Sequence, residues 1–234
     1  EPGNPELPYH QGDRMVDLAL QALEGEGARF VFVNLMEPHT PWVPRIGFTR
    51  GAIDPTLLPG GGQYGRLFQE LIGRRERDEI AQQSWRNAYA AETRFLDAQL
   101  GRLLDGIDDD ALVVVVSDHG EFLGEHDLVE HSKALYDEVL RVPIVLMAPG
   151  VEPGRVPEPV SNLDITPTLL DLLGMPQDGL DGWSMVPLTR GEQSTEFNER
   201  IRSVGRPLYG QERWGVLVGD TKWTSHDGNE EVYD

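Results

Sequence analysis

The sequence predicts an α/β fold: a largely parallel, mixed sheet with helices on both faces, followed by a small C-terminal antiparallel subdomain. Between residues 13 and 173, short runs of β-branched residues alternate with segments of helical periodicity, a pattern typical of α/β proteins. Acidic and imidazole side chains directly follow one of these runs, at the strand end where open α/β sheets bind ligands. From residue 175 onward the segments are short and alternate in polarity, which favours antiparallel strands.

The first part of the chain is predicted to contain two helices and a buried strand. Residues 1–12 carry three prolines and indicate an irregular lead-in. Asp13 is a suitable N-cap for a helix that ends near Leu23. A buried strand is predicted over residues 29–36. Residues 43–66, rich in Gly and Pro, predict a long surface loop that would shape a substrate pocket, and a long helix is expected over 77–104.

The second part centres on four consecutive valines at 113–116, which predict a strand buried on both faces of a sheet. A short helix over 134–140, a strand over 142–147 and a helix over 165–173 follow, the last with Asp164 as N-cap and Gly174 as its stop. The remaining strands are expected at 207–210, 214–218, 222–224 and 230–234. We therefore divide the chain into a partial α/β domain, 1–174, and a small α+β subdomain, 175–234.

Composition excludes several classes of partner. The chain has 234 residues, a formal charge of −20 and no cysteine. So acidic a surface repels phosphate backbones, which argues against nucleic-acid binding. No apolar run approaches the roughly 18 residues of a membrane span, and the sequence shows no signal peptide, so the compartment stays unassigned.

Two predicted strand exits carry the candidate site residues. Asp118 and His119 follow the valine strand, and a carboxylate beside an imidazole is a plausible pair of metal ligands. An isolated Asp-His pair more often caps a loop, but the strand before it and the glycines, histidines and lysine after it favour a site. His39 stands at the other exit between two prolines, and the residues alone favour an exposed loop residue without a functional role.

The string SDHGEFLGEHDLVEHSKALYDEVLRVPIVLMAPG, with AETRFLDAQLGRLLDGI before it and VSNLDITPTLLDLLG after it, resembles the middle and C-terminal part of the sulfatase family, within the alkaline phosphatase superfamily. The resemblance implies an alkaline-phosphatase-like fold and a divalent metal, normally Ca²⁺, held by Asp118 with His119 as its neighbour. Because Ca²⁺ prefers oxygen donors, the imidazole leaves Mn²⁺, Mg²⁺ and Zn²⁺ open.

The same resemblance assigns the remaining candidate residues. Lys133 would reach the sulfate group and the bridging ester oxygen, and His39 would share that work or serve as the acid. His126 and His131 would orient the metal ligands or line the pocket. The implied substrate is a small sulfate ester, of an aryl group or a sugar.

The nucleophile of a sulfatase comes from a C/S-x-P-x-R block that is oxidised to formylglycine, and this sequence contains no such block. We therefore expect the chain to be a fragment that lacks the N-terminal part of the enzyme and does not turn over substrate alone. Two alternatives stay open: a phosphatase or phosphonate monoester hydrolase of the same superfamily, and a non-catalytic module that binds sulfated ligands. A two-metal enzyme needs a further D-x-x-x-H block, and none precedes Asp118, which favours the single-metal branch.

Overall fold

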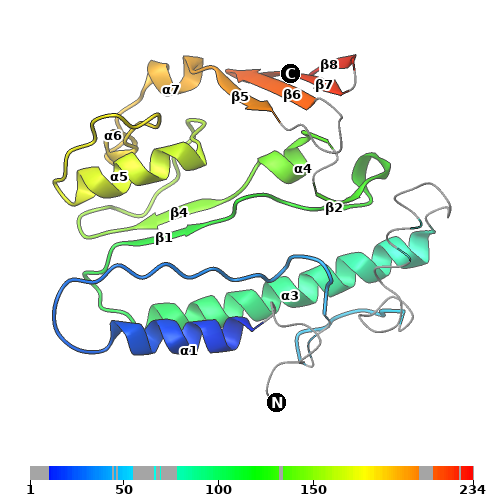
Figure 1. Ribbon diagram of the computed structural model, residues 1–234, viewed down its shortest axis with the longest axis horizontal. Helices are drawn as coiled ribbons and strands as arrows, with labels where there is room; N and C mark the ends of the chain where they lie inside the picture. The colour runs from blue at the N-terminus through cyan, green and yellow to red at the C-terminus, as the bar shows by residue number, and fades with distance from the viewer. Residues whose placement is uncertain are drawn as a thin grey trace. The chain divides into compact units, whose positions relative to one another are not determined.

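The structure is a computed structural model that describes residues 11–43, 45, 47–54, 66, 69, 78–131, 134–205, 213–226 and 228–233. The chain falls into two compact units (Figure 1). The first unit consists of residues up to Asp109 together with Glu121–Glu130, and the second of Asp110–Gly120 together with His131–Asp234. The predicted boundary at residue 174 stays a prediction.

Two helices form the body of the first unit. Helix α1, Gly12–Leu23, lies along helix α3, Glu79–Asp105 (Figure 1). The Asp78 carboxylate caps α3 by accepting a 2.7 Å hydrogen bond from the Ala81 amide. Both predicted helices are confirmed, but the N-cap of α1 is Gln11, and Asp13 lies in the first turn, where its charge complements the helix dipole.

A short hairpin completes the first unit. Its strands, β2 (Phe122–Leu123) and β3 (Val129–Glu130), are antiparallel and joined by the 3₁₀ turn Glu125–Asp127. The core between the hairpin, α3 and the His39 loop is formed by buried apolar side chains: Trp42, Ala81, Trp85, Ala88 and Val129. This core fixes the loop that carries His39.

The predicted buried strand over residues 29–36 is wrong for this structure. The segment runs as an irregular, extended trace (Figure 1), and no strand of the described residues pairs with it. Phe30 is 83% exposed and Phe32 is 80% exposed. The run of β-branched and aromatic residues over 30–33 favours an extended backbone, but a strand also requires a neighbour whose N–H and C=O groups complete its hydrogen bonds.

Two antiparallel sheets organise the second unit. Strand β1, Val113–Val116, pairs with β4, Ile144–Met147, so that Val115 lies opposite Val145. A four-stranded meander follows in the order β5 (Arg202–Gly205), β6 (Arg213–Val218), β7 (Thr221–His226) and β8 (Asn229–Tyr233). The helices are α4 (Asp137–Leu140), α5 (Ile165–Leu172), α6 (Val186–Thr189) and α7 (Thr195–Glu199), with the 3₁₀ turn η3 (Asn162–Asp164) before α5.

These elements confirm the α/β class and the C-terminal antiparallel sheet, whereas the predicted strand at 207–210 lies outside the described residues. The predicted parallel sheet is not seen in the described part, where each strand pair is antiparallel. The connection over residues 117–143 is long enough for a parallel crossover, but its helix α4 has only 4 residues, whereas such a crossover usually contains a full helix. Nor is β1 buried on both faces, since Val116 is 42% exposed.

None of the helices among the described residues is both long enough and apolar enough to cross a bilayer.

Candidate metal and anion site

The loop at the exit of β1 holds Asp118 and His119 through short backbone and side-chain hydrogen bonds. The Ser117 hydroxyl donates to the carbonyl oxygen of His119 at 2.7 Å, and the His119 amide donates to Asp118 Oδ1 at 2.9 Å. The Gly120 amide donates to the carbonyl oxygen of Val139 in α4, also at 2.9 Å. The loop is therefore tied both to itself and to the neighbouring helix, so that its two candidate ligands have a defined direction.

The orientation of the His119 ring suits a metal ligand. Nδ1 lies 3.0 Å from the carbonyl oxygen of Gly120. Because a carbonyl can only accept, Nδ1 carries the proton in the neutral ring, and Nε2 keeps its lone pair. Nε2 in turn lies 3.8 Å from Asp118 Oδ2, and the Asp118 side chain is 88% exposed. One carboxylate oxygen and one imidazole nitrogen are thus close together, and this donor pair fits a divalent metal.

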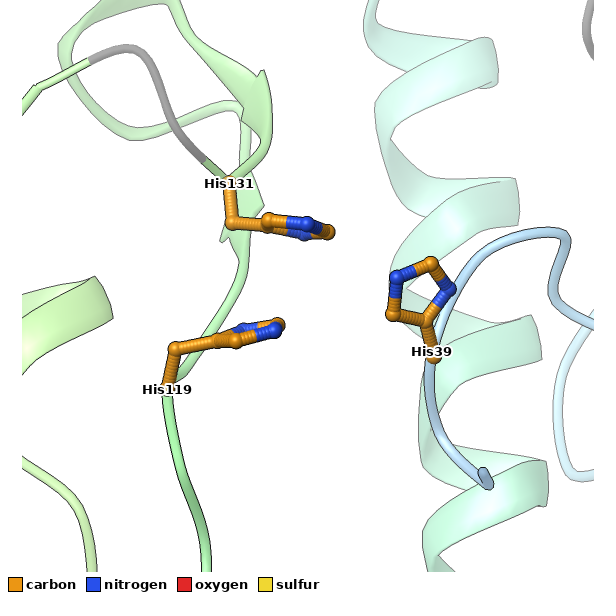
Figure 2. Close-up of side chains that lie close together, drawn as sticks. All are labelled: His39, His119 and His131. Atoms are coloured by element: carbon orange, nitrogen blue, oxygen red, sulfur yellow. The ribbon is translucent and has the colours of Figure 1, made fainter. Parts of the chain in front are cut away.

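His131 lies against His119 in the same unit. The two rings stack with their centroids 4.1 Å apart and their planes 27° apart, as Figure 2 shows. The stack restricts rotation of the His119 ring and brings a second imidazole next to it. The sequence predicted that His131 orients the metal ligands or lines the pocket, and its ring contacts that of His119, one of the two candidate ligands.

His39, also labelled in Figure 2, belongs to the first unit and stands on a loop next to helix α3. Its amide donates to the carbonyl oxygen of Met36 at 2.8 Å, and its Nδ1 lies 2.6 Å from the carbonyl oxygen of Thr40. As with His119, the proton belongs on Nδ1 in the neutral ring, and Nε2 keeps the lone pair. The ring is therefore held by its own loop with Nε2 as the nitrogen that can accept a proton or bind a ligand.

A buried tryptophan anchors this loop. The Trp42 side chain is fully buried, and its indole Nε1 donates to the carbonyl oxygen of Pro38 at 2.9 Å. Its ring contacts those of Trp85 and Tyr89, with centroids 6.4 and 6.3 Å away. The loop thus has an aromatic anchor within three residues of His39.

Beneath the loop lies a buried group of charges that sequence reasoning did not identify. Glu37 Oε1 accepts hydrogen bonds from Arg45 Nη2 at 2.7 Å and from the Gly12 amide at 3.0 Å. Arg45 Nε lies 3.5 Å from Glu92 Oε2, and its guanidinium stacks 3.8 Å from the centre of the Phe95 ring. The side chains of both glutamates are completely buried, so this cluster fixes the ends of the loop to α1 and α3.

Burial raises the pKa of Glu92 from its ordinary 4.5 to about 7, although the Arg45 charge and the Val43 amide partly offset this rise. Between pH 4.5 and 7 the folded protein therefore binds more protons at this site than the unfolded chain, and the free energy of unfolding falls as the pH rises. A glutamine at this position imitates the protonated acid and does not titrate. The Glu92→Gln variant should therefore keep the stability that the unsubstituted protein loses as the pH rises.

We expect the Glu92→Gln variant to gain stability relative to the unsubstituted protein as the pH rises through this window. The total gain is on the order of 3 kcal/mol, and it levels off above about pH 7. Urea unfolding from pH 4.5 to 8 measures the difference, and Glu79→Gln at the exposed start of α3 is the matched control. A difference that stays constant with pH would contradict the raised pKa.

The two remaining sequence candidates are His126 and Lys133. His126 sits in the turn between β2 and β3, with a positive φ of 51°, and its ring makes an edge-to-face contact with Phe122 at 6.3 Å. These positions assign His126 to the hairpin of the first unit, whereas the Asp118 loop belongs to the second. Lys133 lies outside the described residues.

Comparison with known proteins defines the class. The Sulfatase family model matches residues 1–175, so the chain belongs to the sulfatase family. Among curated relatives, the chain is 39% identical over 120 residues to a choline-sulfatase of Rhizobium meliloti (strain 1021) and 33% identical over 163 residues to arylsulfatase K of Homo sapiens. These matches cover 47% and 66% of the chain, but only 23% and 29% of the relatives' own lengths.

Solved structures agree on the fold. A phosphonate monoester hydrolase from Silicibacter pomeroyi superposes with a TM-score of 0.76 at 21% identity, over 96% of this chain and 53% of that protein. A 2-O GAG sulfatase superposes with a TM-score of 0.64, also at 21% identity, over 96% of this chain and 50% of that protein. The neighbours confirm the fold of the alkaline phosphatase superfamily that the resemblance implied, and this chain spans about half of their length.

Proposed function

We propose that this chain carries part of the active site of a sulfuric ester hydrolase, with a divalent metal on Asp118 and His119. The observation that supports it is the geometry at the exit of β1, where His119 Nε2 and Asp118 Oδ2 lie 3.8 Å apart with the imidazole proton committed to Nδ1. When bound, the metal supplies a Lewis acid for the charge of the sulfate group. The resemblance favours Ca²⁺, and the imidazole nitrogen keeps Mn²⁺, Mg²⁺ and Zn²⁺ as candidates.

The other residues act on the anion and the leaving group. Lys133 contributes a positive charge to the sulfate and the bridging ester oxygen. His39 is held by its loop with Nε2 as the reactive nitrogen. As an imidazolium, with a proton on Nε2 as well as on Nδ1, it binds the sulfate or donates the Nε2 proton to the departing oxygen. His131, stacked on His119, keeps that ring in place, with His119 Nε2 beside the Asp118 carboxylate. A formylglycine-type nucleophile is expected in the complete enzyme and is not encoded in these 234 residues.

The substrate class is a small sulfate ester, an aryl or sugar sulfate. The relatives named choline-sulfatase and arylsulfatase K support a sulfate ester, since they share the sulfatase family with this chain. Phosphonate monoester hydrolases resemble the chain in fold alone, so hydrolysis of phosphate or phosphonate esters is the second candidate.

The full-length protein is expected to hydrolyse p-nitrophenyl sulfate faster than p-nitrophenyl phosphate. The 234 residues alone are expected to hydrolyse neither ester.

In the full-length protein, Asp118→Asn removes one negative charge from the metal pair. It is expected to lower kcat/KM for p-nitrophenyl sulfate at least about a hundredfold, as loss of a transition-state charge contact does. The control is Asp110→Asn, an exposed acid in the turn before β1. Preference for the phosphate ester would favour the second candidate, and equal losses in the two variants would refute the assigned metal pair.

A further inference from the structure

A side chain from a different part of the second unit contacts the loop that bears the metal ligands. Asn162 begins the 3₁₀ turn η3, and its Nδ2 donates to the carbonyl oxygen of Ser117 at 3.0 Å. Ser117 immediately precedes Asp118. The contact joins residues 45 positions apart in the sequence, so it is a tertiary contact and not part of the local turn.

The backbone at Asn162 is itself firmly held. Ser161 and Asp164 form a reciprocal capping box around η3, with the Ser161 amide donating to Asp164 Oδ2 at 2.8 Å. Asp164 is completely buried, and its Oδ1 accepts from the Trp183 amide at 2.9 Å and from Arg200 Nη1 at 2.6 Å. Arg200 also lies over the Trp183 ring, 4.4 Å from its centre. The backbone at Asn162 is therefore held by the buried, hydrogen-bonded Asp164 carboxylate, although the Asn162 side chain itself is at the surface.

The contact controls the direction of the following residue. The carbonyl of Ser117 and the amide of Asp118 share one planar peptide unit, which also contains the Cα atom of Asp118. A hydrogen bond that fixes the carbonyl oxygen therefore also fixes the orientation of this peptide plane. The Asp118 carboxylate is 88% exposed, and it contacts the backbone amide and the ring of the adjacent His119. Its direction is consequently set by the backbone of the loop and not by packing of the side chain.

We propose that Asn162 is a positioning residue, which orients the Asp118 carboxylate through its hydrogen bond to the Ser117 carbonyl. The inference deepens the proposed function and rests on it, because its consequence is metal affinity at Asp118 and His119. Loss of one such hydrogen bond is expected to weaken Mn²⁺ binding about three- to tenfold. It is also expected to speed amide hydrogen exchange at His119 and Gly120, since both amides are hydrogen-bonded within or from this loop.

The test compares Asn162→Ala with Asn198→Ala in the 234-residue chain. Asn198 is a matched control, since its Nδ2 also donates to a backbone carbonyl, that of Ser194 at 3.3 Å within α7. Isothermal titration with Mn²⁺, hydrogen exchange in the metal-free protein and the thermal unfolding midpoint are measured for both variants. We expect weaker Mn²⁺ binding and faster exchange at residues 118–120 for Asn162→Ala only, with equal midpoints for the two variants.

The exchange data separate this inference from the proposed function. If the unsubstituted chain binds no Mn²⁺ while exchange at residues 118–120 accelerates in Asn162→Ala, the proposed metal centre fails and the positioning role stands. If exchange at these amides is unchanged, the positioning role is overturned, whatever the Mn²⁺ affinity. A lower unfolding midpoint with exchange accelerated throughout the second unit would also overturn it, because Asn162 would then be a general structural residue.

Discussion

Replacing Gly120 with alanine is expected to weaken metal binding at the exit of β1 by at least about a hundredfold. A Cβ at this position would lie 2.0 Å from the carbonyl oxygen of Glu138 and 3.4 Å from Cα of Val139. Both atoms belong to the backbone of α4, so no side-chain rotation relieves the clash. The loop must move away from α4 and lose the hydrogen bond from the Gly120 amide to the Val139 carbonyl.

The displacement acts on affinity and stability together. A shift of about 1 Å in a positioned group costs on the order of a hundredfold in function, and we expect Mn²⁺ affinity to fall by at least that factor. Overpacking and the lost hydrogen bond together lower the free energy of unfolding by about 3 kcal/mol. Mn²⁺ titration without urea, at a temperature at which the variant is folded, measures the affinity. Urea unfolding measures the free energy of unfolding.

Gly154→Ala is the control for this variant, because the nearest atom to its added Cβ is 3.9 Å away. It should bind Mn²⁺ like the unsubstituted chain and unfold at the same urea concentration. Normal Mn²⁺ affinity in Gly120→Ala would mean that the loop between β1 and α4 does not determine the metal site.

Replacing Trp42 with alanine is expected to destabilise the first unit by about 4 kcal/mol, the range measured for fully buried aromatic side chains. The indole fills the core against Trp85 and Tyr89, and nothing in its place would donate to the Pro38 carbonyl. Because the same side chain anchors the loop with His39, the variant should also lose the defined orientation of the His39 ring. Urea unfolding monitored by tryptophan fluorescence measures the stability.

Trp42→Phe separates packing from hydrogen bonding. Phenylalanine keeps most of the apolar contact but has no N–H group, so we expect a cost of about 1 to 2 kcal/mol. The His39 side-chain resonances, followed by NMR in the folded protein, should shift in both variants. Unchanged His39 resonances in Trp42→Ala would show that the loop is held by the Glu37, Arg45 and Glu92 cluster alone.

The sequence allowed prediction of those elements whose signal is local. Helix α3 combines an N-cap at Asp78 with an apolar stripe, and the strands of the C-terminal meander alternate in polarity, so both were predictable. The Asp118–His119 pair was predictable as a candidate because its strand and glycines are contiguous with it. The strand predicted over residues 29–36 was wrong for the converse reason. A run of β-branched and aromatic residues indicates an extended backbone, while strand formation depends on a partner elsewhere in the chain.

The long-range polar contacts could not be predicted in the same way. Glu92 gave one usable signal, since it lies on the apolar stripe of α3, four residues after Ala88 and three before Phe95, where a buried acid requires a partner. The sequence does not identify that partner as Arg45, because the two residues meet only through tertiary structure. Asn162 lacked any signal of this kind, since its position in η3 is explained by local capping without reference to Ser117.

Electron spin echo spectroscopy of the 234-residue chain loaded with Mn²⁺ tests the central claim directly, because it detects an imidazole ¹⁴N bound to the metal. We predict a ¹⁴N coupling that disappears in His119→Ala and a bound Mn²⁺ signal that is lost in Asp118→Asn. A Mn²⁺ signal without ¹⁴N coupling, or a coupling that survives in His119→Ala, would contradict the assignment of Asp118 and His119 as the metal ligands.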